Sequence, residues 1–142
     1  WKKFHERIRA RDITNVALVW ESAALCGGSS LEGWYPGDEF VDWIGARYGE
    51  CANEVVQFAR EHNKPLMLEA ASQGAAWDEW FNPFFKFVND NNDVVRAVMY
   101  INSDDSQIDL ITDNLKRWKD ETKKTFWLRA NPSLFDALGF DN

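Results

Sequence analysis

Short apolar runs alternate along the chain with amphipathic segments, and this alternation limits the folds that the chain can adopt. The four runs begin near residues 16, 40, 66 and 94, and each is short enough for a single strand. Mostly apolar runs of this length are typical of strands that are buried on both faces. The predicted strands cover residues 16–20, 40–46, 66–68 and 94–101.

The segments around these runs carry apolar residues at helical spacing. In the clearest of them, Trp77, Phe81 and Val88 belong to one wide apolar face. Pro65 terminates the helix before the third strand, because proline cannot continue a helix. The tail from Phe126 onward is expected to form a short helix packed against the body. The predicted helices cover residues 1–13, 52–62, 77–88 and 108–119. Strands and helices in this order predict an α/β fold with a parallel sheet.

Length and charge narrow the class of protein further. The 142 residues suit a single domain, residues 1–142. A net charge of −7 argues against binding to nucleic acid or to an anionic membrane surface, because both partners are themselves negatively charged. No apolar run approaches the roughly 20 residues that span a bilayer. The eight tryptophans suit either an aromatic core or rings that stack on sugars.

The ends and the cysteines bear on processing and metal binding. The chain opens at Trp1, with neither Met nor a signal peptide, so we expect a processed, trimmed or partial chain. Cys26 and Cys51 could form one disulfide or remain two thiols. A two-cysteine zinc site would need histidine partners, and the chain has only His5 and His62. No metal site is therefore predicted.

Polar residues gather where the predicted strands end. The first strand runs into Glu21, and the second into Arg47 and Tyr48. Glu69 follows the third strand, and Asn102 the fourth. Parallel α/β sheets carry their chemistry at the carboxyl ends of the strands, so these residues are the candidates for a site.

Residues 34–45 read WYPGDEFVDWIG, and five further stretches lie in a fixed order along the chain, at residues 15–20, 58–67, 80–85, 100–102 and 131–140. In this order the stretches resemble clan A glycoside hydrolases, most closely the β-mannanase-like family 26. Residues 34–45 resemble the entry to strand six of that family. The resemblance implies the C-terminal half, strands five to eight, of a TIM-type (β/α)8 barrel that is secreted or extracellular.

A full barrel takes roughly 250 residues, so four βα units make only half of one. Half a barrel exposes strand edges and an apolar face. We therefore expect the missing N-terminal half-barrel, or another protein chain, as a partner. The alternative is a smaller four-stranded α/β domain.

The resemblance also implies a retaining mechanism, in which two carboxyl groups lie about 5–5.5 Å apart. The acid/base at strand four would precede Trp1, and Glu69 is the candidate nucleophile of strand seven. The family has Glu one position later, where this chain has Ala70. A one-residue displacement would point Glu69 away from the site, whereas a deletion within the strand would restore it. Both registers remain open from the sequence.

The remaining candidates are substrate-binding residues. Tyr48 is expected to hydrogen-bond the nucleophile, while Arg47 is either part of the site or a structural ion pair. Trp20 and Trp43 stand at alternating strand positions, so one of the two is expected in the core. Asn102 ends the fourth strand.

A second departure from the family also weakens the catalytic interpretation. After the fourth strand, Asp104 and Asp105 stand where the family has aromatic residues, and helix capping and a solvated acidic turn explain them better than catalysis. Glu21, at the end of the first strand, is better explained as an ordinary surface residue than as a catalytic one.

The predicted function is hydrolysis or binding of a mannan-like β-glycan, with a polysaccharide or oligosaccharide as ligand. The alternative is a catalytically inactive barrel that serves as a structural or glycan-binding component of an extracellular assembly. Neither needs a metal or an organic cofactor, because glycoside hydrolysis uses carboxylates and water.

Overall fold

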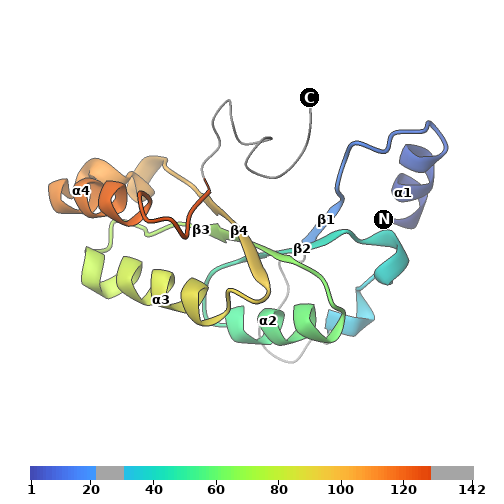
Figure 1. Cartoon of the computed structure of the whole chain (residues 1–142), viewed down its shortest axis with the longest axis horizontal. Helices are drawn as coiled ribbons and strands as arrows, with labels where there is room; N and C mark the ends of the chain where they lie inside the picture. Colours follow the sequence, from blue (N-terminus) through green and yellow to red (C-terminus); the bar gives the residue numbers. More distant parts are fainter. Residues whose placement is uncertain (22–30, 129–142) are drawn as a thin grey trace.

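The computed structural model describes residues 1–21 and 31–128, and it contains one four-stranded parallel sheet (Figure 1). The strands lie side by side in chain order, and each pairs in parallel with the next. They are β1 (Val19–Glu21), β2 (Trp43–Arg47), β3 (Leu66–Ala70) and β4 (Val95–Tyr100). The predicted α/β class and the parallel sheet are confirmed.

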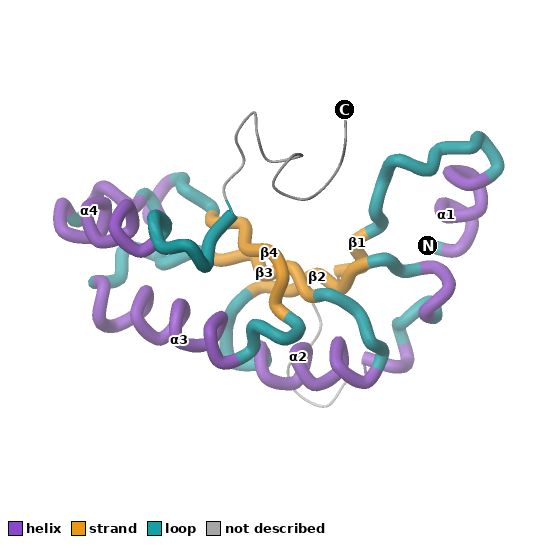
Figure 2. The backbone as a smooth tube through the Cα atoms, in the orientation of Figure 1, coloured by secondary structure: helices purple, strands orange, loops and turns teal. Residues whose placement is uncertain are grey.

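Helices follow the strands as the alternation predicts. Within the described residues the α-helices are α1 (Lys2–Arg9), α2 (Ala52–Glu61), α3 (Asn82–Asp90) and α4 (Thr112–Glu121). Figure 2 shows α2 and α3 on the same side of the sheet, below it in this view. Such an order, with crossover helices on one face, is compatible with half of a TIM-type barrel.

Several element boundaries differ from the prediction: α1 ends at Arg9, β1 begins at Val19 and α4 begins at Thr112. Two further differences have local reasons. The segment Asp38–Phe40 forms a 3-10 turn after Gly37, whose φ of 112° favours glycine, and β2 therefore begins only at Trp43. The helix predicted from residue 77 starts as a π-helical turn, Trp77–Phe81, before α3. Pro83 lacks the N–H that a regular α-helical turn would use here.

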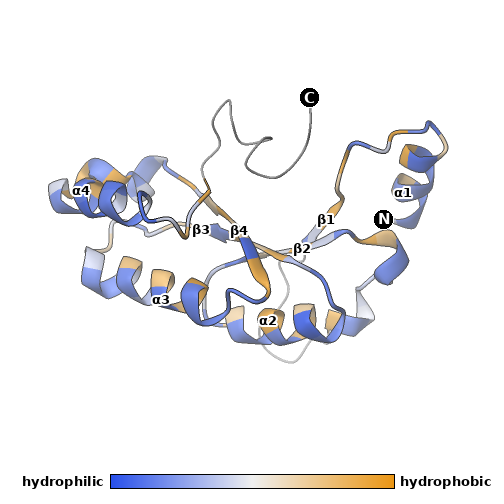
Figure 3. Ribbon diagram, in the orientation of Figure 1, coloured by the Kyte–Doolittle hydropathy of each residue, from blue (hydrophilic) through white to orange (hydrophobic). Residues whose placement is uncertain are grey.

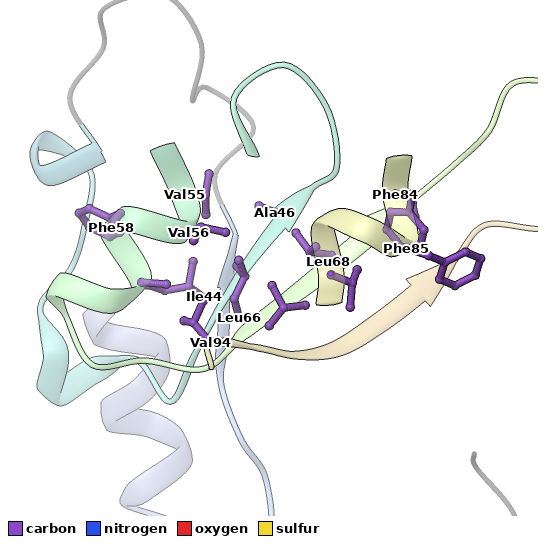
Figure 4. Close-up of a cluster of buried hydrophobic side chains, with 14 of the residues drawn as sticks. Ile44, Ala46, Val55, Val56, Phe58, Leu66, Leu68, Phe84, Phe85 and Val94 are labelled. Carbon is purple, nitrogen blue, oxygen red and sulfur yellow. The ribbon is translucent and has the colours of Figure 1, made fainter. Parts of the chain in front are cut away.

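The core lies between the sheet and the helices. Figure 3 shows that the apolar sides of α2 and α3 face the strands. Alternate strand residues fill this layer, because successive side chains of a strand point to opposite faces. The labelled members of the cluster in Figure 4 are Ile44, Ala46, Val55, Val56, Phe58, Leu66, Leu68, Phe84, Phe85 and Val94, which are all buried.

The other face of the sheet carries the intervening residues, and we call it the open face. The register aligns Gly45 with Met67 and Arg47 with Glu69, and it aligns Met67 with Ala97 and Glu69 with Met99. A register shift beside Leu66 and Met67 brings the β4 residues into this alignment. Met99 is 50% exposed. An apolar surface in this position fits a sheet that packs against further structure.

The C-terminal helix predicted after Phe126 falls mostly on residues 129–142, which lie outside the described residues.

Candidate functional site at the carboxyl ends of the strands

Glu69 lies on the open face, near the end of β3, and is paired with Arg47 of β2. The Nη2 and Nε atoms of Arg47 donate hydrogen bonds to Oε1 of Glu69 at 2.7 and 3.0 Å. The two residues are also register partners in the parallel ladder. The Glu69 side chain is 17% exposed, whereas that of Arg47 is 69% exposed. The carboxylate is thus the more enclosed half of the pair.

Strand alternation explains why Glu69 takes this position. Leu68 and Ala70 are fully buried in the helix-side core, so the residue between them must point to the opposite face. Of the two registers that the sequence leaves open, the structure has Glu69 on the open face and Ala70 in the core. This is the orientation that a nucleophile would need.

Gly45 gives the side chains of β1 room beside this pair. A Cβ atom at Gly45 would lie 3.0 Å from Cγ1 of Val19 and 3.2 Å from Cβ of Glu21. Val19 and Glu21 therefore stand over the open face next to β2. Glu21 is exposed and becomes the second carboxylate on this face.

Tyr48 turns the other way. Its ring packs against Phe84, Phe87 and Trp80, with centroids 5.0, 5.3 and 5.6 Å away. Burial against these rings raises the pKa of the Tyr48 hydroxyl. Only the backbone N–H of Tyr48 bonds to Glu69, donating to its carbonyl oxygen at 2.7 Å. The side chain therefore joins the helix layer, and the expected side-chain bond to the carboxylate is not formed in this structure.

The two tryptophans divide as alternation predicts. Trp20 is buried in the helix layer against Tyr35 and Phe58. Trp43 is partly exposed and aligns with Val19 on the open face. Of the pair, only Trp43 stands on the same face as Glu69.

Asn102 has a role in its own loop. Its Oδ1 accepts a hydrogen bond from the backbone N–H of Ile108 at 2.8 Å. Asp104 adopts a left-handed conformation (φ 48°) in a short 3-10 turn, and Asp105 accepts a hydrogen bond from Ser106 at 3.1 Å. Neither carboxylate caps a helix, because the turns at Asp104–Ser106 and Ile108–Leu110 and helix α4 have no side-chain cap hydrogen bond. The acidic pair lies instead in an exposed turn, which was the other part of the structural interpretation.

A buried hydroxyl network ties the loops after β3 and β4 together, and sequence reasoning missed it. The Tyr100 hydroxyl lies 2.7 Å from Oγ of Ser72 and donates to the carbonyl of Ser106 at 2.7 Å. Ser106 Oγ accepts from the backbone N–H of Gln73 at 3.0 Å. Ser72 and Ser106 are both buried. The network fixes the rim of the site beside Glu69.

Cys51, at the start of α2, is disulfide-bonded, and Cys26 lies outside the described residues. Within residues 1–21 and 31–128, no group of three or more His, Cys, Asp or Glu side chains could hold a metal ion. None of the helices described is long and apolar enough to cross a membrane.

The fold and the site define an α/β protein with a carboxylate at the carboxyl edge of a parallel sheet. Two curated proteins are similar to the whole of this chain. "Beta-1,3-xylanase TXYA" from Vibrio sp is 28% identical over 194 residues, which cover 100% of the chain and 42% of that protein. "Beta-1,3-xylanase" from Alcaligenes sp is 27% identical over 192 residues, covering 99% of the chain and 41% of that protein.

The chain therefore spans about two fifths of the length of these relatives. The matched spans exceed the 142 residues of the chain, so both relatives carry residues inside the match that this chain lacks. No family model matches the chain, and no solved structure matches it.

Proposed function

We propose that this chain is part of a glycoside hydrolase that cleaves a β-glycan, with Glu69 as the nucleophile of a retaining mechanism. The observation that carries the proposal is the position of Glu69: a partly enclosed carboxylate on the open face, at the carboxyl end of a parallel strand. The likeness to two proteins named as β-1,3-xylanases supports a polysaccharide as the ligand. It makes β-1,3-xylan the first substrate to test, ahead of mannan.

The chemistry assigned to Glu69 has two steps. A carboxylate oxygen of Glu69 bonds to the anomeric carbon as the bond to the leaving-group oxygen breaks, and a carboxylic acid of the protein protonates that oxygen. Water then attacks the anomeric carbon, gives its proton to the same acid group and frees Glu69, with net retention of configuration.

A retaining mechanism needs a second carboxyl group about 5–5.5 Å from the nucleophile. Glu21 is the other carboxylate on the open face, and it lies on β1, two strands from Glu69. We assign the acid to the remaining half of a family 26-like, clan A barrel. That half would also cover the open face.

A catalytically inactive barrel, which serves as a structural or glycan-binding component of an extracellular assembly, is the second candidate. The loop after β4 has Asn102 and Asp105 engaged in its own hydrogen bonds, and Met99 is the β4 residue beside Glu69. The described part of the site thus offers no exposed aromatic ring next to Glu69 on β4 for sugar stacking.

We also propose an extracellular location, supported by the disulfide at Cys51. Disulfides persist mainly in oxidising compartments.

The test measures hydrolysis of β-1,3-xylan, β-1,4-xylan and β-1,4-mannan by the full protein and by Glu69→Gln. The hydrolase proposal expects cleavage of at least one glycan with retained configuration, and a loss of at least about 10³-fold in kcat for Glu69→Gln. Binding of a glycan without cleavage would support the inactive alternative. Full activity in Glu69→Gln would exclude Glu69 as the nucleophile.

A further inference from the structure

We propose that Arg47 is a positioning residue, which holds one oxygen of Glu69 and leaves the other free to attack the substrate. This inference rests on the proposed function of Glu69. Both hydrogen bonds from Arg47 end on Oε1. Among the hydrogen bonds of the described parts of the chain, none ends on Oε2.

A second arginine–carboxylate pair in the same fold shows what a purely structural contact looks like. Arg60 uses Nε on Oδ2 of Asp93 at 2.7 Å and Nη2 on Oδ1 at 2.8 Å. That guanidinium engages both oxygens, which is the common fork arrangement and the one that occupies the carboxylate fully. Arg47 instead bonds a single oxygen. The difference leaves Glu69 oriented, with one oxygen still available.

The exposure of the pair argues against stability as the main role of Arg47. A salt bridge with a solvent-exposed partner contributes little to folding, because water screens the charges and a long side chain must be ordered. Arg47 is 69% exposed, whereas Glu69 is enclosed. Orientation of a reacting carboxylate is worth far more, since a small misplacement of a reacting group can lower the rate by about 10²-fold.

The position of Arg47 also suits this role. It is the register partner of Glu69, so its guanidinium approaches from the β2 side of the carboxylate. Met99, the partner on β4, has no charge and no hydrogen-bond donor on its side chain. Arg47 is therefore the one cation that orients Glu69 among the residues that the structure describes.

The test compares Arg47→Gln, Arg47→Lys and Glu69→Gln in the full protein, with Arg60→Gln as the matched control. Two quantities are measured: kcat and KM on the glycan that the wild-type protein cleaves, and covalent labelling by a 2-deoxy-2-fluoro-xylobioside with an activated leaving group. Labelling reports attack by the Glu69 carboxylate on the probe. The rate constant of labelling reports how well Glu69 is oriented, and the final amplitude of labelling gives the fraction of folded protein.

Positioning predicts that Arg47→Gln lowers kcat and the labelling rate constant by about 10²-fold, with KM nearly unchanged and the labelling amplitude intact. Arg47→Lys should recover part of the rate, because an ammonium can still donate to one oxygen. Arg60→Gln should label at the wild-type rate.

Several outcomes would overturn the inference. A wild-type labelling rate in Arg47→Gln would show that Glu69 needs no orientation by Arg47. A change confined to KM would make Arg47 a substrate contact, and a change confined to the amplitude would make it structural. The proposed function fails in a separate way, through an inactive wild-type protein or a fully active Glu69→Gln, and either result would also remove the basis for positioning.

Discussion

His62 and Asp38 are joined by a hydrogen bond of 2.8 Å between Nδ1 and Oδ1, while Nε2 of the same ring lies 2.9 Å from Oε1 of Glu32. Both nitrogens face carboxylates, and only the imidazolium form can donate from both. The Tyr35 hydroxyl donates to Asp38 as well, and Lys64 donates to the Asp38 carbonyl. This cluster joins the end of α2 to the turns that precede β2.

The cluster predicts that stability depends on pH. Partial burial lowers the pKa of His62, but hydrogen bonds and charge attraction from Glu32 and Asp38 outweigh it, so the pKa is raised above 6.5. Burial raises the pKa of Asp38, and its bonds from His62 and Tyr35 outweigh that effect, so the pKa is lowered below 3.8. The free energy of unfolding should be largest between these values.

The two signs follow from linkage. The contribution of His62 is complete below its unfolded pKa and is lost as pH rises through the folded one, whereas that of Asp38 is lost as pH falls through its own folded pKa. Urea unfolding of the full protein from about pH 2 to 9 measures the loss of stability on both sides. His62→Gln should reduce the fall in the free energy of unfolding on the alkaline side. An unchanged fall in that variant would contradict this account.

Gly45 predicts a steric effect beside the site. Gly45→Ala places a Cβ against Val19 and Glu21, in the tight contacts given above, and should lower the free energy of unfolding by about 1–3 kcal/mol. Gly49→Ala is the control, because nothing lies within 4 Å of its added Cβ, and it should change stability by less than about 0.5 kcal/mol. Equal effects in chemical denaturation would mean that the space over Gly45 is not filled.

Substitutions of Tyr48 should affect the stability of the protein without affecting its activity to the same degree. Tyr48→Phe keeps the ring that packs on Phe84 and Trp80, so kcat should remain within about twofold of the wild-type value. Tyr48→Ala removes the ring and should lower the free energy of unfolding by about 2–4 kcal/mol. A large loss of kcat in Tyr48→Phe would instead show that the hydroxyl reaches Glu69 during the reaction.

If a second half-barrel covers the open face, Met99 should be protected from oxidation. Met99 is half exposed on this face, and a second half-barrel packed there would shield it. In the native full protein, hydrogen peroxide should oxidise Met99 at least about tenfold more slowly than in the unfolded protein, because oxidation needs exposure. Mass spectrometry of the Met99 peptide measures both rates. Equal rates would favour the small α/β domain over the half-barrel.

Much of the fold could be predicted from the sequence because burial dominates its pattern. The run at residues 66–70 is apolar at every second position, and the structure buries Leu66, Leu68 and Ala70. The start of β2 could not be predicted as well, since Gly37 and the 3-10 turn at Asp38–Phe40 delay the strand by local geometry.

The site was harder to predict because it depends on orientation. The chemical identity of Glu69 was evident, but its face depends on which neighbours enter the core, and sequence reasoning left that open. Tyr48 follows Arg47 directly, and alternation alone could have placed the two side chains on opposite faces. The link between Tyr100 and Ser72 had no comparable signal, because it joins residues 28 apart through loop geometry.

Strand β3 carries core and chemistry on adjacent residues, and this limits how its length can drift. A single residue gained or lost between Pro65 and Glu69 would exchange the two faces of the strand, so that a charged side chain would enter the aromatic core and an alanine would lie on the open face. A two-residue change would keep each side chain on its face, but it would shift the pairing of β3 with β2 and β4 by two residues. Natural variants of this protein should therefore vary in length in the connecting loops, and within β3 only in pairs.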